Sequence, residues 1–260
     1  MTIKIKLFSK LIVNRGLFKY LLISYILCLE ALYVHGQNTD LKEDNPSDAY
    51  QFALGLYNNA VKYQELVFTG SEYNAMTGKL TGHPYLIYDN FMEDTIVFDG
   101  MVFPNIPLQY DIVHDELIVS YVDQRSYKTA IQLRKDKVNS FIIDRAIFIY
   151  VGVGNWNTLA PGYYNLLYDG ETVLLKKIKK KVRKEVDIEG VHISFKEIID
   201  YIIIKQNQPY YITNKKSLFR TLHDKEKELS VFSKEEKLRF KDQKEEDMIN
   251  LIQYYDQINK

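Results

Sequence analysis

Apolar and polar residues alternate regularly in the middle of the chain, and this feature most limits how the chain can fold. Ile106, Leu108 and Tyr110 begin one such run, in which every second position is apolar. A period of two places alternate side chains on opposite faces of a β-strand. Asp99-Gly100 and Asp169-Gly170 each separate two runs, and Asp-Gly supplies the positive φ angles that tight hairpin turns require. The middle of the chain is therefore predicted to form antiparallel hairpins.

Further β-branched and aromatic runs extend this pattern over about residues 65 to 213. They lie at 95–98, 101–103, 116–122, 129–133, 138–151, 163–168 and 171–175. We predict an α+β, mainly β fold, in which an antiparallel meander forms a curved sheet, a sandwich or an open barrel. Glycine and proline residues between 152 and 162 predict a loop that crosses one end of the sheet.

Helical patterns flank the β region on both sides. Apolar residues at helical spacing predict a helix over 46–63, and a C-terminal helical extension is expected over about 215–258. Ser233 to Glu236 matches a capping box and Asp242 to Glu245 resembles one, so each predicts a helix start. One apolar stripe follows the second box and is predicted to face the protein core: Met248, Leu251, Ile252 and Tyr255.

The first 36 residues have the pattern of a cleaved signal peptide. A basic segment precedes an apolar run at 20–29, which is shorter than the roughly 20 residues that span a bilayer. Cleavage is expected after Gly36, with Gln37 as the first mature residue; a retained anchor and lipid attachment at Cys28 are the less favoured alternatives. We therefore expect residues 37–260 to form one exported β-rich domain without a transmembrane span, located in the periplasm, at the outer-membrane periphery or outside the cell.

Composition limits the partners and the chemistry. The 34 Lys and Arg residues equal the 34 Asp and Glu residues, and this balance argues against a nucleic-acid partner. Cys28 is the single cysteine and lies inside the leader, so the mature chain is expected to have no disulfide and no cysteine metal site.

Titratable residues concentrate where Asp111, His114, Asp115 and Glu116 lie close together. Histidine beside carboxylates suits a general base or a metal ligand. The same residues suit a polar turn between two strands, which we favour, and no second histidine stands at a metal-motif spacing. Asp111 and His114 are kept as candidate catalytic residues. No nucleophile elbow, P-loop or dinucleotide-binding motif is present, and neither a cofactor nor a metal is expected.

The most basic segment is KKIKKKVRK at 176–184. If it is a strand, one face carries four cations: Lys177, Lys179, Lys181 and Arg183. Such a face is suited to a polyanion such as an anionic glycan or a lipid headgroup. The alternatives are an edge strand protected by lysines and a solvated loop.

Tyrosine is abundant, with 21 residues against 13 Phe and 1 Trp. Four aromatic residues near the glycine-rich loop are candidates for a surface on which sugar rings stack: Tyr150, Trp156, Tyr163 and Tyr164. Cross-strand pairing and packing at the edge of the core are the favoured alternative.

Several segments carry a resemblance to other proteins. They are FTGSEY (68–73), GHPY (82–85), VFDG (97–100), LQYD (108–111) and GYYNLLYDG (162–170). In this order they resemble a broad family of uncharacterised secreted, β-rich proteins of Bacteroidota, over about residues 46 to 258. The resemblance implies export and a β-rich architecture, and it assigns no activity to any residue.

Together these features predict an exported, non-catalytic binding or envelope-associated module. Its expected partners are envelope glycans, lipid headgroups or an outer-membrane protein. The alternatives are an extracytoplasmic hydrolase that uses carboxylate and histidine chemistry, and a structural partner of an outer-membrane complex. Carboxylate pairs of the glycosidase kind stay open, because their separation in space rather than in sequence defines them.

Overall fold

A computed structural model describes residues 67–122, 126–156, 159–188, 190–241 and 244–259. All of them belong to the compact unit Ala60–Lys260. The predicted signal peptide, its cleavage site at Gly36 and Gln37, and the predicted helix over 46–63 lie outside the described residues.

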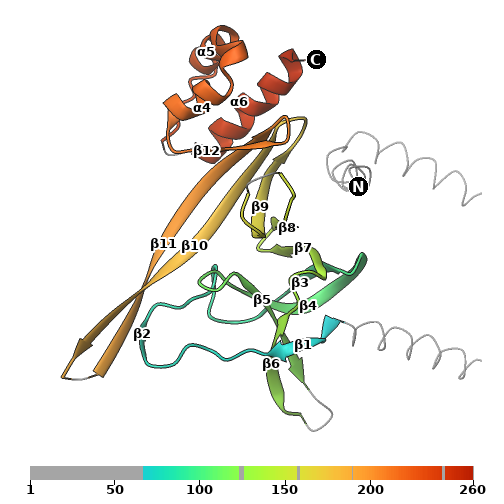
Figure 1. Ribbon diagram of the computed structural model, residues 1–260, viewed down its shortest axis with the longest axis vertical. Helices are drawn as coiled ribbons and strands as arrows, with labels where there is room; N and C mark the ends of the chain where they lie inside the picture. Colours follow the sequence, from blue (N-terminus) through green and yellow to red (C-terminus); the bar gives the residue numbers. More distant parts are fainter. Residues whose placement is uncertain (1–66, 123–125, 157–158, 189, 242–243, 260) are drawn as a thin grey trace, which may run out of the picture. The chain divides into compact units, whose positions relative to one another are not determined.

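Twelve strands within these residues form one open sheet (Figure 1). They are β1 (Gly70–Glu72), β2 (Lys79–Thr81), β3 (Met92–Phe98), β4 (Met101–Asp111), β5 (Glu116–Val122), β6 (Lys128–Leu133), β7 (Val138–Ile143), β8 (Ala146–Val151), β9 (Gly162–Asp169), β10 (Val173–Asp187), β11 (Gly190–Lys205) and β12 (Gln208–Ile212). The order is β1-β6-β5-β4-β3-β7-β8-β9-β10-β11-β12, and β2 pairs with β11 in parallel. The predicted mainly β, α+β fold is confirmed.

The strand order differs from a single meander. Strands β3 to β6 form one meander and β7 to β12 form a second, and the two join where β3 pairs with β7. The run predicted over 138–151 is two strands, because Asp144 and Arg145 both have positive φ angles (50° and 67°) and turn the chain between β7 and β8. Both predicted hairpins are confirmed, since β3 pairs with β4 and β9 pairs with β10 in antiparallel register. Asp99 and Gly100 have the predicted positive φ angles (51° and 82°), whereas Asp169 and Gly170 do not, because residues 170–172 form a longer connection between β9 and β10.

Helices follow the last strand, as predicted. They are α4 (Lys215–Thr221), the 3₁₀ helix η1 (His223–Lys225), α5 (Glu226–Glu235) and α6 (Lys244–Ile258). The capping box at Ser233 was a wrong prediction, because Ser233 lies near the end of α5; a capping box instead links Asn214 and Ser217 at the start of α4. The predicted box at Asp242 begins outside the described residues. None of the helices described here is long and apolar enough to cross a membrane.

The core consists of three groups of buried side chains. Strands β3 to β9 contribute the largest, in which the Phe141 and Phe148 rings stack at 5.0 Å and Tyr110 and Tyr163 meet them edge-on. A second group packs the α6 stripe against Leu174 and Ile203, so the predicted docking of this helix is confirmed. The third group lies on the other face of β9 to β11 and includes Tyr164, Leu175 and Ile202.

The hairpin of β10 and β11 is the longest element and positions the candidate site. The strands pair over 15 positions, from Val173↔Ile204 to Asp187↔Gly190. The register with β9 covers Val173 to Lys176, and the register with β12 covers Tyr201 to Lys205. The hairpin extends beyond both neighbours, and β2 joins it near its end at His192 to Ser194 (Figure 1). The basic segment of β10 lies in this extension from Lys177 onward.

Candidate functional site

The β4–β5 turn, residues 112–115, lies against the side of β10. The backbone N–H of Lys180 donates to the carbonyl oxygen of Ile112 at 3.0 Å. Its Nζ donates to the carbonyl oxygens of His83, at 3.0 Å, and Tyr85. Burial of this ammonium group lowers the pKa of Lys180. Lys180 therefore fixes β10 to the β4–β5 turn and to the segment that precedes β3, and it is not available to a ligand.

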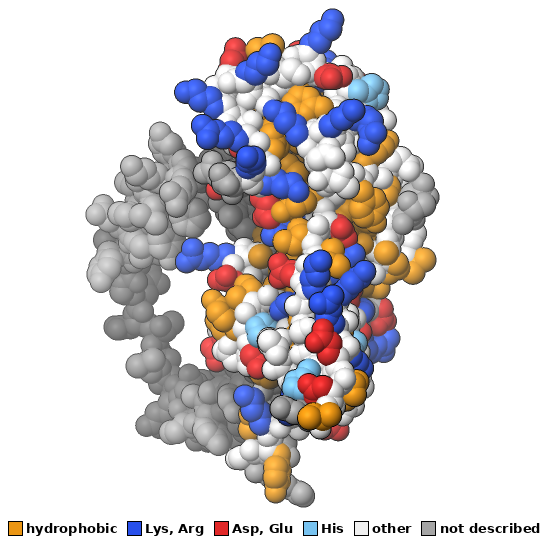
Figure 2. Space-filling model, turned by 90° about the vertical axis from the view of Figure 1, so that its left-hand side faces the viewer, with side chains coloured by type: hydrophobic (Ala, Val, Ile, Leu, Met, Phe, Trp, Pro, Cys, Tyr) orange, Lys and Arg blue, Asp and Glu red, His pale blue; other side chains and the backbone are white. Residues whose placement is uncertain are grey.

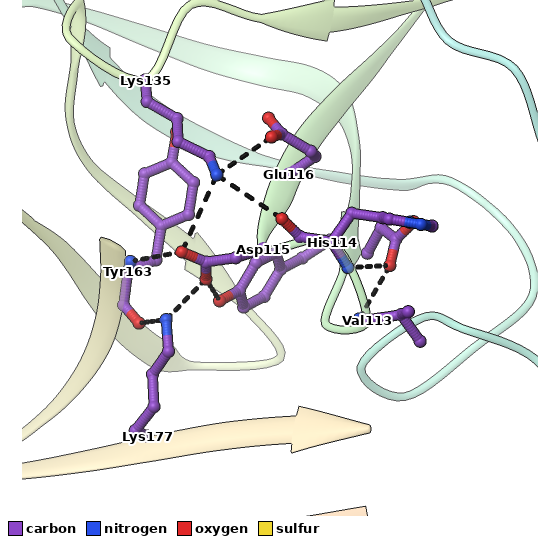
Figure 3. Close-up of polar contacts among 9 residues, drawn as sticks. Val113, His114, Asp115, Glu116, Lys135, Tyr163 and Lys177 are labelled. Atoms are coloured by element: carbon purple, nitrogen blue, oxygen red, sulfur yellow. Dashed lines mark hydrogen bonds and ion pairs between the residues drawn. The ribbon is translucent and has the colours of Figure 1, made fainter. Parts of the chain in front are cut away.

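Lys177 forms a second, buried connection between the same elements (Figure 3). Its Nζ lies 2.6 Å from Oδ1 of Asp115 and donates to the carbonyl oxygen of Tyr163 at 2.8 Å. Asp115 also accepts from the Tyr110 hydroxyl and from the Tyr163 amide. Burial lowers the pKa of Lys177, although the Asp115 carboxylate acts in the opposite direction. This ion pair anchors the hairpin.

The tyrosines around this anchor belong to the core. Burial, followed by the charge of Asp115, raises the pKa of both Tyr110 and Tyr163. Tyr163 is 1% exposed, and its hydroxyl has no hydrogen-bond partner among the described residues. Lys135 adds a partly buried connection, with its Nζ 2.9 Å from Oε1 of Glu116 and 3.9 Å from Oδ2 of Asp115 (Figure 3).

Asp111 and His114, the two candidate catalytic residues, are in contact. Asp111 is fully buried, and its Oδ2 lies 2.7 Å from Nδ1 of His114. The same carboxylate accepts from the amides of Val113 and His114 and from the Tyr73 hydroxyl. Burial and the Asp111 carboxylate raise the pKa of Tyr73. These contacts define a hydrogen-bonded turn, as favoured from the sequence, with the His114 side chain 53% exposed.

This turn has limited metal-binding capacity. Within the described ranges, no group of three or more His, Cys, Asp or Glu side chains is arranged to hold a metal ion. The carboxylate of Asp111 is already used by two amides and a hydroxyl. Its chemical role toward His114 is to fix the orientation of the imidazole ring.

The exposed cations of the hairpin form a different set from the predicted one. Lys179, Lys181 and Arg183 are exposed and share one face of β10, whereas Lys177 on the same face is only 9% exposed and is held by Asp115. The structure adds Lys196, which lies directly opposite Lys181 in the β10–β11 register. We call Lys179, Lys181, Arg183 and Lys196 the cationic strip. Figure 2, which faces the side where the hairpin ends, shows Lys and Arg side chains gathered beside acidic ones.

The strip carries more positive charge than its neighbours neutralise. Lys179 pairs with Asp200 at 2.7 Å. In the part of the chain that the structure describes, no salt bridge involves Lys181, Arg183 or Lys196. Like charges directly opposite each other in an antiparallel pair are destabilising. Lys196 was missed because its position opposite Lys181 depends on the register of the whole hairpin.

The predicted stacking surface of Tyr150, Trp156, Tyr163 and Tyr164 is not formed. Tyr163 and Tyr164 are consecutive in β9, so their side chains lie on opposite faces, and both are buried. Tyr150 pairs with Tyr163 across the strands, with ring centroids 5.6 Å apart, and Trp156 packs against the third core group, which includes Tyr164. The alternative of cross-strand pairing and packing at the core edge is confirmed.

An aromatic residue that sequence analysis did not select lies on the same face as the strip. Tyr211 in β12 is 56% exposed and lies opposite Ile202 of β11, which in turn lies opposite Leu175 of β10. Odd-numbered residues of β10, including Lys179 and Lys181, share that face. Burial, with smaller contributions from Tyr211, Asp115 and Asp200, raises the pKa of Tyr164 nearby.

Comparison of the chain with protein-family models, curated proteins and solved structures gave no match.

Proposed function

We propose that the protein is an exported, non-catalytic binding protein that holds an anionic ligand of the cell envelope on the cationic strip. The observation that carries this proposal is the Lys181↔Lys196 pair, in which two exposed cations face each other across the hairpin. Such a pair opposes folding, and an anionic ligand between the two ammonium groups reverses the sign of the interaction. The leader pattern of residues 1–36 supports export.

The strip is suited to reversible, salt-sensitive binding. Exposed charges interact in a high dielectric, and screening becomes strong beyond about 10 Å at an ionic strength of 0.1 M. Neighbouring strip residues on β10 are about 7 Å apart, within that length. Several anionic groups of one ligand can therefore be attracted together at low salt and released at high salt.

The test compares two double charge reversals in the full chain. Lys181→Glu with Lys196→Glu changes the strip, and Lys227→Glu with Lys234→Glu makes the same change in charge on the exposed surface of α5. Retention on immobilised dextran sulfate and sedimentation with purified envelope fractions are measured at low and high salt. We expect the first variant to lose salt-sensitive binding while the second keeps it. Equal retention of both variants, or no binding by the unmodified protein, refutes the proposal.

Hydrolysis at the β4–β5 turn is the second candidate, favoured by the 2.7 Å contact between Asp111 and His114. A buried carboxylate that binds Nδ1 leaves Nε2 of an exposed imidazole to accept a proton from water. Hydrolysis of chromogenic ester, phosphoester or glycoside substrates that His114→Gln abolishes would establish this function. Activity that the variant leaves unchanged excludes this site.

A further inference from the structure

The cationic strip is linear. Lys179, Lys181 and Arg183 occupy alternate positions of one regular strand, so their side chains leave the same face at intervals of about 7 Å. Lys196 lies beside Lys181 on the neighbouring strand, about 5 Å away between Cβ atoms. A row of this kind matches a ligand that repeats its negative charges along a line.

We propose that the ligand is a linear acidic polysaccharide that lies lengthwise along the strip and reaches Tyr211. This inference rests on the proposed function and names its ligand class. The negative groups of the polymer contact Lys181, Arg183 and Lys196, and a sugar ring stacks on the exposed ring of Tyr211. Tyrosine suits this role because its flat apolar face packs on a sugar ring while its hydroxyl forms hydrogen bonds.

The surroundings of the strip support a polymer rather than a bilayer. Glu185 and Asp187 lie on the same face between the strip and the hairpin end. A membrane approached by the hairpin end would meet these carboxylates before the cations, and an anionic membrane surface repels them. Val186 and Ile188 are exposed at this end (78% and 103%), but the acidic neighbours oppose their entry into an anionic interface.

The other end of the strip is suited to uncharged sugar groups. Asp200 lies opposite Lys177 in the β10–β11 register, and its side chain is 34% exposed while it pairs with Lys179. Its carboxylate oxygens can accept further hydrogen bonds from sugar hydroxyl groups. After Asp200, the next residue on that face of β11 is Ile202. Ile202 is buried, and the exposed Tyr211 of β12 lies opposite it. Negative charge is thus favoured along the strip, and ring stacking with hydroxyl recognition is favoured toward β12.

The experiment separates the ligand class from the binding function. The full chain is titrated with four probes by calorimetry: polygalacturonate, inorganic polyphosphate, phosphatidylglycerol vesicles and a single-stranded oligonucleotide. We expect polygalacturonate to have the highest affinity of the four probes when each concentration is expressed as the concentration of negative charges. Tyr211→Ala should weaken polygalacturonate binding about threefold to tenfold and leave polyphosphate binding unchanged, because polyphosphate has no ring to stack.

Two variants serve as controls for Tyr211→Ala. Tyr210→Ala removes a neighbouring exposed ring (41%) on the opposite face of β12, and it should leave affinity unchanged. Tyr211→Phe keeps the ring and should retain most of the affinity. Unfolding curves of each variant verify that the fold is intact.

The outcomes are distinct. Strip-dependent binding in which vesicles, oligonucleotide or polyphosphate match or exceed polygalacturonate overturns the polysaccharide class and leaves the proposed function standing. Equal effects of Tyr211→Ala and Tyr210→Ala on polygalacturonate binding likewise overturn the polysaccharide class alone. Failure of all four probes to bind overturns both proposals.

Discussion

Removal of the Lys177 ammonium group should destabilise the fold much more than removal of the Lys179 ammonium group, although the two lysines lie on one face of one strand. The change to methionine keeps most of the side-chain volume and removes the charge in both cases. Lys177 and its partner Asp115 are 11% and 22% exposed, whereas Lys179 and its partner Asp200 are 47% and 34% exposed. The two substitutions therefore remove the same charge from a buried and from an exposed ion pair.

The contrast in burial sets the expected magnitudes. Loss of one partner of a buried pair costs about 3–5 kcal/mol, because the other charge stays buried without compensation. Asp115 keeps its hydrogen bonds from Tyr110 and Tyr163 and the Lys135 ammonium group 3.9 Å away, so we expect about 3 kcal/mol for Lys177→Met, at the lower end of that range. An exposed pair contributes about 0–1 kcal/mol, which is the expected cost of Lys179→Met.

Urea unfolding monitored by circular dichroism measures both free energies, and the melting temperature gives an independent value. A loss of about 3 kcal/mol corresponds to a decrease of about 6–12 °C for a domain of this size. The double variant Lys177→Met with Asp115→Asn should be more stable than Lys177→Met alone, because it removes a carboxylate that has lost its nearest cation. Equal costs for Lys177→Met and Lys179→Met would refute the conclusion that Lys177 anchors the hairpin.

Three further predictions concern other parts of the fold. Asn214→Ala should lower the free energy of unfolding by about 1 kcal/mol, because the Asn214 side chain caps α4. Gly162→Ala should cost about 1–3 kcal/mol, since Gly162 has a φ of +151° and an added Cβ would clash with the Asp115 carboxylate. Stability should fall as pH rises above about 10, where tyrosines ionise in the unfolded chain while burial raises the pKa of Tyr110 and Tyr163 in the fold. Urea midpoints measure all three effects.

Each of these predictions has its own control. Asn214→Asp keeps a capping side chain and should preserve stability, whereas a loss equal to that of Asn214→Ala would exclude the capping explanation. Gly152→Ala places its Cβ at ordinary contact distance, 3.6 Å from the Tyr150 ring, and should cost less than Gly162→Ala. The lowered pKa values of Lys177 and Lys180 favour the fold as pH rises, but these two groups are outnumbered by the buried tyrosines. A urea midpoint that increases above about pH 10 would contradict the tyrosine prediction.

Hairpin turns were predictable because their chemistry is local. The turn at Asp99-Gly100 can be identified from these two adjacent residues alone, and each flanking strand shows its own alternation of apolar and polar residues. Asp144 and Arg145 also form a two-residue turn with positive φ angles, but Arg is not a residue type that indicates this conformation. The pattern at Ser233 failed for the opposite reason, because a capping box can occur by chance inside a helix that has already begun.

The candidate site was predictable only in part, because it depends on long-range pairing. The alternation of lysines indicated a cationic face, but the burial of Lys177 depends on Asp115, which is 62 positions away in the chain. The register that places Lys196 opposite Lys181 likewise cannot be derived from the sequence of either segment alone. For Tyr211, exposure depends on its place in the last strand of the sheet.

The place of β3 between β4 and β7 has a consequence for the newly made chain. During synthesis β4, β5 and β6 emerge directly after β3 and can pair in sequence. The second neighbour of β3 is β7, which emerges later than these strands. Until then the far edge of β3, which carries Ile96 and Phe98, has free amide and carbonyl groups that another nascent chain can bind. Translation pauses before β7 leaves the ribosome should therefore increase aggregation more than pauses after β7 has emerged.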